Sequence, residues 1–204
     1  DLDGDGLLEL AIGTSMGFLY VLSARDGKLR DGFPVQMNEI QAQVVAADVD
    51  GDGSLELIVS DAVGSVASWR ANSDSMWEVQ TSGMCAQAIT LTSLYRNGTV
   101  QLIVPTVAGL VHVLDGATGV EVSPFPVKTA GQVLSAVVVV ELLVSPLVLA
   151  SHLDAGSTAP HLIFSSFDGY LYLVNALTGC TQKIDVGEHS YSQVLADDLT
   201  GNGR

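Results

Sequence analysis

The segment Asp48-Val-Asp-Gly-Asp-Gly-Ser-Leu-Glu56 recurs at residues 1–9 as Asp1-Leu-Asp-Gly-Asp-Gly-Leu-Leu-Glu9. Both copies place aspartates at positions one, three and five, glycines at positions four and six, and a glutamate at position nine. Each glutamate begins an apolar run, ELIVS or ELAIG, which is typical of a strand. The segment therefore predicts two acidic loops, each leading into a β-strand at the same point of a repeating unit.

The unit around these loops occurs four times. In every unit a glycine lies eight residues after position nine, in the pairs Glu9 and Gly17, Glu56 and Gly64, Gln101 and Gly109, and His161 and Gly169. The position-nine residues are 47, 45 and 60 residues apart, and each unit contains about four β-rich runs separated by turns. Such repeats predict an all-β fold, a β-propeller fragment of about four four-stranded blades that is part of a larger ring.

We expect a single partial propeller domain over residues 1–204. Its blades are predicted at approximately 1–39, 40–83, 84–130 and 131–188, with the next blade beginning in 189–204. The longest spacing indicates an insertion at 144–159. The apolar run 133–150 is interrupted by Glu141 and Pro146. We interpret it as a buried strand followed by the insertion, with a membrane span as the alternative.

The two acidic loops are expected to bind Ca²⁺, which takes six to eight oxygen ligands. Four carboxylates in one short loop repel one another unless a cation neutralises them. Mg²⁺ is disfavoured because it keeps its waters and requires strict octahedral geometry. The expected ligands are the side chains of Asp1, Asp3, Asp5 and Glu9 with the Leu7 carbonyl, and those of Asp48, Asp50, Asp52 and Glu56 with the Ser54 carbonyl.

The corresponding loops of later units have lost their acids. The third has Ser93, Tyr95, Asn97 and Gln101 at these positions, and the fourth has Glu141, Leu143 and His161. No metal is expected in either. The segment Asp198, Thr200 and Asn202 begins a fifth loop and is a marginal candidate for Ca²⁺.

The composition excludes some classes of function. Acidic residues outnumber basic ones 23 to 8, and a net charge of −15 argues against binding to nucleic acid. Cys85 and Cys180 lie in different units without metal-ligand spacing. One disulfide is possible, but we favour two free, buried thiols.

The acidic repeats resemble a known family. DLDGDGLLELAIG and DVDGDGSLELIV are similar to FG-GAP repeats of the type found in integrin α-subunit propellers. FPVQMNEIQAQVVAADVDGDG, SSFDGYLYLVNALTGCT and IDVGEHSYSQVLADD resemble more closely the plant "defective in exine formation" proteins. This resemblance carries the family's Ca²⁺ positions over onto the two acidic loops.

The resemblance also implies a cellular setting. It implies a secretory-pathway protein, on the plasma membrane or extracellular side or in the ER–Golgi lumen, with a membrane anchor elsewhere in the chain. It implies protein, glycan or extracellular-matrix partners, and a role in cell-wall or matrix assembly or adhesion. The sequon Asn97-Gly98-Thr99 agrees with secretion and makes Asn97 a candidate glycosylation site.

Two classes of function remain after the motif search. The histidines His112, His152, His161 and His189 have no partner at the spacing of a metal site or a catalytic triad. We expect His112 to be packed within a strand and His161 to be exposed. LYVLSARDG and LYLVNALTG are similar to blades of quinoprotein enzymes, so such an enzyme is the alternative. The favoured interpretation is a non-catalytic interaction module.

Overall fold

The computed structural model describes residues 1–95, 98–143 and 158–197, and within these ranges it contains strands but no helix. The first sheet consists of β1 (Glu9–Gly13), β2 (Phe18–Ser23) and β3 (Val35–Gln36). The second consists of β4 (Val45–Ala47), β5 (Glu56–Ser60), β6 (Ser65–Trp69) and β7 (Ser75–Gln80). The third consists of β8 (Thr90–Thr92), β9 (Gln101–Pro105), β10 (Leu110–Asp115) and β11 (Val127–Lys128). The fourth consists of β12 (Val138–Leu143), β13 (Thr158–Ser165), β14 (Tyr170–Asn175) and β15 (Thr181–Asp185).

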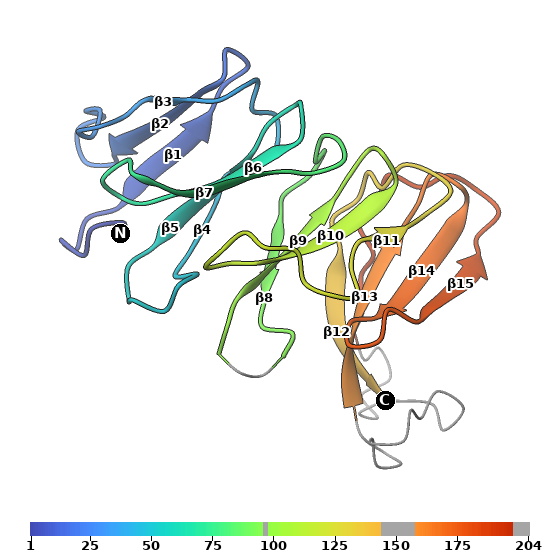
Figure 1. Cartoon of the computed structure of the whole chain (residues 1–204). Helices are drawn as coiled ribbons and strands as arrows, with labels where there is room; N and C mark the ends of the chain where they lie inside the picture. The colour runs from blue at the N-terminus through green and yellow to red at the C-terminus, as the bar shows by residue number, and fades with distance from the viewer. Residues whose placement is uncertain (96–97, 144–157, 198–204) are drawn as a thin grey trace.

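All four sheets are antiparallel meanders in chain order, and they follow one another from the N-terminal to the C-terminal part of the molecule (Figure 1). This is the arrangement of successive propeller blades. The first sheet has three described strands rather than the expected four. In the other sheets the first strand precedes the loop, whereas residue 1 already lies in the loop of the first sheet. The predicted boundaries between blades stay a prediction.

The eight-residue offset of the repeat has a direct structural cause. Glu9, Glu56 and Gln101 are the first residues of their strands. Each of these strands is followed by a tight turn that contains the glycine eight residues further on, and the turn leads into the next strand. Gly17 has a φ of 82°, and a Cβ there would lie 2.4 Å from the Met37 carbonyl oxygen. A glycine is therefore required at this point of the turn. In the fourth sheet β13 already begins at Thr158, ahead of His161.

The core is divided into three hydrophobic clusters, each between consecutive sheets. Strand β5 shows why the central strands read as unbroken apolar runs. Leu57 and Val59 face the cluster shared with the first sheet, whereas Ile58 faces the cluster shared with the third sheet. Because both faces of the strand are covered, all its residues are buried.

Strand β1 has a covered face on one side only. Its burial alternates along the strand, and Leu10 and Ile12 are 55% and 54% exposed on the face away from the second sheet. Burial alternates along β1 because one of its faces packs against a described sheet, and it does not alternate along β5 because both faces do.

The apolar run 133–150 includes Val133 and Val137 in the core cluster between the third and fourth sheets, and its residues 138–143 form β12. The remainder of this run and most of the predicted insertion lie outside the described residues. Among the described residues, no helix is long and apolar enough to cross a membrane.

Candidate metal centre

The acidic loops occupy equivalent places in the first two sheets. Loop 2 (residues 48–56) connects β4 to β5, and loop 1 (residues 1–9) leads into β1. Each ends on a glutamate that begins the following strand, so the hydrogen-bonded sheet fixes the last candidate ligand.

Loop 2 is held by hydrogen bonds from its own backbone to its aspartates. Asp48 accepts from the N–H groups of Gly51 and Gly53, at 2.7 and 3.0 Å. The loop's two other aspartates each accept from the N–H two residues further on, at 3.1 and 2.7 Å. Gly51 and Gly53 have φ values of 81° and 90°, which other residues rarely adopt. The backbone therefore turns around the carboxylates without help from other elements.

Glu56 closes loop 2 from a buried position. The residue is 1% exposed, and its Oε2 accepts a hydrogen bond from the Val49 N–H at 3.0 Å. Carboxylate oxygens of Asp48, Asp50 and Glu56 all lie within 4.8 Å of one another. Burial raises the pKa of Glu56, and the negative charges of the loop's three aspartates raise it further. This set of oxygens has the chemistry of a site for a hard cation.

Loop 1 repeats the backbone pattern of loop 2. Asp1 accepts from Gly4 and Gly6 at 2.7 and 2.9 Å, and the Leu2 N–H donates to Glu9 Oε2 at 2.6 Å. The converging carboxylates here are those of Asp1, Asp3 and Asp5. The Glu9 carboxylate is engaged differently, because its Oε1 accepts from Arg30 Nη1 at 2.9 Å.

Each acidic loop has an arginine on the aspartate at position three. Arg30 Nη2 pairs with Asp3 Oδ2 while its Nη1 pairs with Glu9. The guanidinium group holds the pKa of Asp3 below its usual value. In loop 2, Arg70 Nη2 lies 3.5 Å from Asp50 Oδ2. Neither arginine was expected from the sequence, because no fixed spacing connects them to the loops.

The third loop retains the closing hydrogen bond without the charge. Gln101 is 1% exposed, and its Oε1 accepts from the Leu94 N–H at 2.8 Å, as Glu56 does from Val49. Tyr95, at position three, packs against the core between the third and fourth sheets. Asn97 lies outside the described residues, so its candidacy for glycosylation stays a prediction.

The structure describes only some of the residues at the predicted ligand positions of the fourth and fifth loops. Glu141 and Leu143 lie in β12, and half-buried His161, expected to be exposed, lies in β13 with its Nδ1 2.8 Å from the Ala159 carbonyl oxygen. The structure thus places Glu141, Leu143 and His161 in strands rather than in a compact loop. The candidates Asp198, Thr200 and Asn202 fall outside the described residues.

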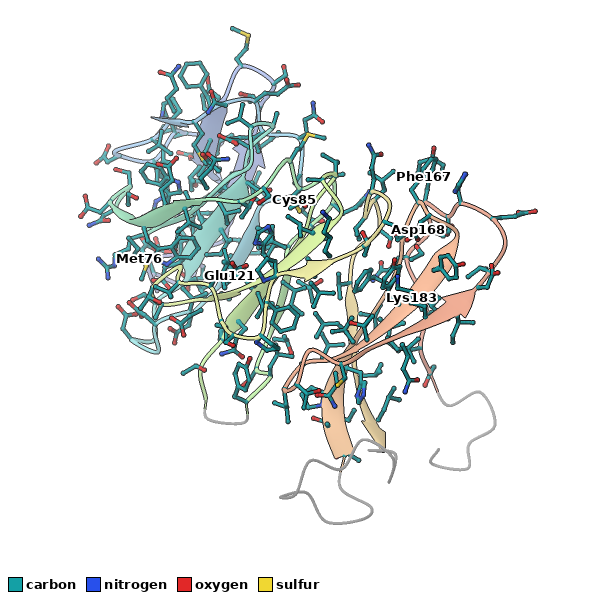
Figure 2. All side chains as sticks on the ribbon, turned by 45° about the vertical axis from the view of Figure 1, so that its right-hand side comes forward. Met76, Cys85, Glu121, Phe167, Asp168 and Lys183 are labelled. Atoms are coloured by element: carbon teal, nitrogen blue, oxygen red, sulfur yellow. The ribbon has the colours of Figure 1, made fainter. Side chains whose placement is uncertain are left out.

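The histidine expected to be merely packed has a carboxylate partner. His112 is buried, its Nδ1 lies 2.6 Å from Glu121 Oε1, and the Ser82 N–H donates to its Nε2 at 3.4 Å. The Nδ1 hydrogen therefore points to Glu121 (labelled in Figure 2), which lies beside β10 through the bridge of Leu114 with Glu121. The sequence does not predict this pairing, because the residues meet only when the segment of Glu121 pairs with β10.

Both cysteines are free, as favoured, but only one is buried. Cys85 lies in the core between the second and third sheets (Figure 2), and burial raises the pKa of its thiol to about 11. Cys180 is exposed, which corrects the expectation of two buried thiols. It follows the turn glycine Gly179, and its carbonyl oxygen accepts a hydrogen bond from the Asn175 N–H at 2.9 Å.

Comparison with known proteins supports the repeat. Residues 1–59 match the FG-GAP-like repeat family. This match covers loops 1 and 2 and ends before the third loop. No curated protein matches the chain, and the more specific resemblance to the plant exine family stays a prediction.

Solved structures share the fold. Over 93% of this chain, BamB from Moraxella catarrhalis superposes with a TM-score of 0.61 at 20% identity. The computationally designed Ika8 protein gives the same TM-score at 14% identity, and BBS1N in complex with ARL6DN gives it at 15% identity over 92% of the chain. The chain spans about half the length of these structures, 50 to 55%. Together with the sheets, they identify a β-propeller arrangement of blades.

Proposed function

We propose that this chain is a non-catalytic, calcium-binding β-propeller module. The observation that carries the proposal is the exchange of Glu56 for Gln101 at equivalent buried positions. Both side chains accept the same backbone hydrogen bond, so that bond requires no negative charge. The charged residue, glutamate, occurs in the loop that has three aspartates, and the neutral residue, glutamine, occurs in the loop that has none at the corresponding positions. A cation that needs the whole set of carboxylates explains why the glutamate and the aspartates occur together.

The residues fit Ca²⁺ better than other ions. The donors are all oxygen atoms, from three aspartates, one glutamate and a backbone carbonyl per loop. Such a hard donor set excludes the soft metals that prefer sulfur or imidazole. When bound, Ca²⁺ would neutralise the carboxylates and tie the loop to the first residue of β5 or β1. In loop 2 the ion would be held by Glu56, at the start of β5, and by Asp48, at the start of the loop.

The test is calorimetric titration with Ca²⁺ combined with thermal unfolding in Ca²⁺ and in EDTA. We expect two binding events, and stabilisation of about 2.7 kcal/mol per site at an ion concentration one hundred times the Kd. Asp50→Ala should remove one event and leave the other. Glu78→Gln, an exposed acid on β7, is the matched control and should keep both. Absence of heat and an unchanged melting temperature in EDTA would contradict the proposal.

The proposed role of the ions is structural support of an interaction surface. Among the described residues, the groups of three or more metal-ligating side chains are those of loops 1 and 2. Their donor sets bind a hard ion but include neither a nucleophile nor a paired acid and base. A quinoprotein-like enzyme, the alternative, would carry a coloured cofactor. We expect the purified protein to have no visible absorbance.

We further propose that the module works on the luminal or extracellular side of the secretory pathway, with a protein or glycan partner in wall or matrix assembly. The support is the sequence resemblance together with the loops, since extracellular calcium modules are suited to Kd values of about 10⁻⁴ to 10⁻³ M. Expression through the secretory pathway should give a glycosidase-sensitive shift that Asn97→Gln removes. Retention of the protein in the cytosol would contradict this setting.

A further inference from the structure

The two acidic loops share one sequence pattern but differ in their surroundings. In loop 2 the Glu56 carboxylate converges with those of Asp48 and Asp50. In loop 1 the converging group is Asp1, Asp3 and Asp5, and it does not include Glu9. The nine-residue pattern cannot explain this difference, because both loops place the glutamate on the first residue of a strand.

Arg30 contacts loop 1 at two of its candidate ligands. Its guanidinium group bridges Asp3 Oδ2 and Glu9 Oε1, so it binds position three and position nine of loop 1 together. The side chains of Arg30 and Glu9 are 23% and 3% exposed, so Arg30 reaches a nearly buried carboxylate. Two charge-assisted hydrogen bonds from one guanidinium group, one of them to a nearly buried carboxylate, hold Arg30 more firmly than a single surface ion pair would.

Arg70 makes a much weaker contact with loop 2. It reaches Asp50 alone, at 3.5 Å, and its side chain is 47% exposed. Glu56 keeps its hydrogen bond from Val49 and has no arginine on it within the described residues. The carboxylates of loop 2 are therefore left in the converging arrangement that a cation requires.

We propose that Arg30 is a built-in competitor for calcium at loop 1, so that the two loops fill in sequence. Loop 2 binds Ca²⁺ first, and loop 1 fills at a higher concentration, when the guanidinium group leaves Asp3 and Glu9. This inference rests on the proposed function, because it assigns different calcium affinities to the two proposed sites.

The structure offers the displaced guanidinium group a place. A cavity of about 590 Å³ adjoins Arg30 and is also lined by Asp3, Asp31 and Asn72. Asp31 and Asn72 supply oxygen acceptors there, so the side chain can leave the loop without losing all its partners. Sequential filling then adds a second, weaker calcium-dependent step to the first two blades.

The experiment isolates loop 1 by silencing loop 2 with Asp50→Asn. Calcium titration of this variant is compared with that of Asp50→Asn combined with Arg30→Met. We expect removal of Arg30 to tighten binding at loop 1 about fivefold to tenfold, because two ion pairs no longer compete with the ion.

The matched control is Arg70→Met combined with Glu9→Gln, which silences loop 1 and removes the arginine of loop 2. Binding at loop 2 should change less than twofold, because a solvent-exposed contact at 3.5 Å contributes little. Arg30→Lys keeps the positive charge but cannot bridge two carboxylates in one plane, so it should give an intermediate affinity.

The signs of two measurements separate competition from a merely structural role. Arg30→Met should lower the melting temperature in EDTA and raise the calcium affinity of loop 1. A purely structural arginine would lower both. Equal affinities of the two loops in the wild-type protein, or an unchanged loop 1 affinity in Arg30→Met, would overturn this inference. If none of the proteins binds Ca²⁺, the proposed function itself fails.

Discussion

Gln101 takes the structural place of Glu56. Each is the first residue of its strand, each is 1% exposed, and each accepts a hydrogen bond from the N–H of its loop's second residue. One carries a negative charge and the other does not. The pair therefore offers a controlled comparison, within one molecule, of a loop built with charge and a loop built without it.

Glu56→Gln should fold normally and lose calcium binding at loop 2. The amide can keep the hydrogen bond from Val49, and it removes a buried charge, so the melting temperature in EDTA should equal or exceed that of the wild type. In Ca²⁺ the variant should be the less stable protein. The check is thermal unfolding in both conditions. Wild-type calcium affinity at loop 2 in this variant would contradict the role given to Glu56.

Gln101→Glu should have the opposite effect. It places a carboxylate at a buried position whose loop has Ser93 and Tyr95 in place of aspartates. A buried charge without a partner costs about 3 kcal/mol or more of the free energy of unfolding. Denaturant unfolding should show this loss, and added Ca²⁺ should not restore it. A variant as stable as the wild type would show that charge is tolerated at this position without a cation.

Asp168, in the turn between β13 and β14, accepts two acid-sensitive hydrogen bonds, and the one from Ala130 joins the third sheet to the fourth. Tyr172 donates to Asp168 Oδ2 at 2.5 Å, and the Ala130 N–H donates to the same oxygen at 3.2 Å (Asp168 is labelled in Figure 2). Burial alone would raise the pKa of Asp168, but the hydrogen bonds from Tyr172 and its neighbours lower it overall. The contribution is present above the ordinary pKa of 3.8 and is lost as pH falls through the lower folded-state value.

Tyr172→Phe should lower the free energy of unfolding by about 1 kcal/mol at neutral pH. The difference from the wild type should shrink as the pH falls from 3.8 through the lower folded-state pKa of Asp168. Denaturant unfolding at several pH values measures it. A difference that is constant down to the acid transition would show that the bond does not depend on the charge of Asp168.

The two thiols should react very differently. Cys180 is exposed and should be modified rapidly by a thiol reagent in the native protein. Cys85 is buried and has a pKa of about 11, so it should react only after unfolding. One equivalent of label before denaturation and two after it is the expected result. Rapid labelling of Cys85 in the native protein would contradict its place in the core.

Strand β5 should tolerate substitution far less than an exposed turn. Ile58→Ala empties a site between the second and third sheets and should cost about 2 to 5 kcal/mol. Val120→Ala, at a position that is 63% exposed in the segment after β10, is the matched control and should change stability by less than about 0.5 kcal/mol. Denaturant midpoints measure both. A loss from Ile58→Ala as small as that from Val120→Ala would contradict the buried place of Ile58.

The sequence by itself determined the repeating strands and the places of the two acidic loops between them. The eight-residue offset predicted where strands begin and turn. The spacing of Asp48, Asp50, Asp52 and Glu56 predicted an acidic loop, in which carboxylate oxygens of Asp48, Asp50 and Glu56 lie close together. These features depend on residues close together in the chain, so local patterns are sufficient to predict them.

Only the tertiary structure decided which charges oppose one another. Arg30 meets Glu9 across 21 residues, and His112 meets Glu121 through a bridge beside its strand. It also decided that Cys85 is buried in the core and that Cys180 is exposed, because burial depends on which sheets lie alongside. Such pairings follow from how strands and blades pack, and no fixed spacing in the sequence encodes them. Loops 1 and 2 therefore share their pattern of residues, while the packing around each loop gives them different partners.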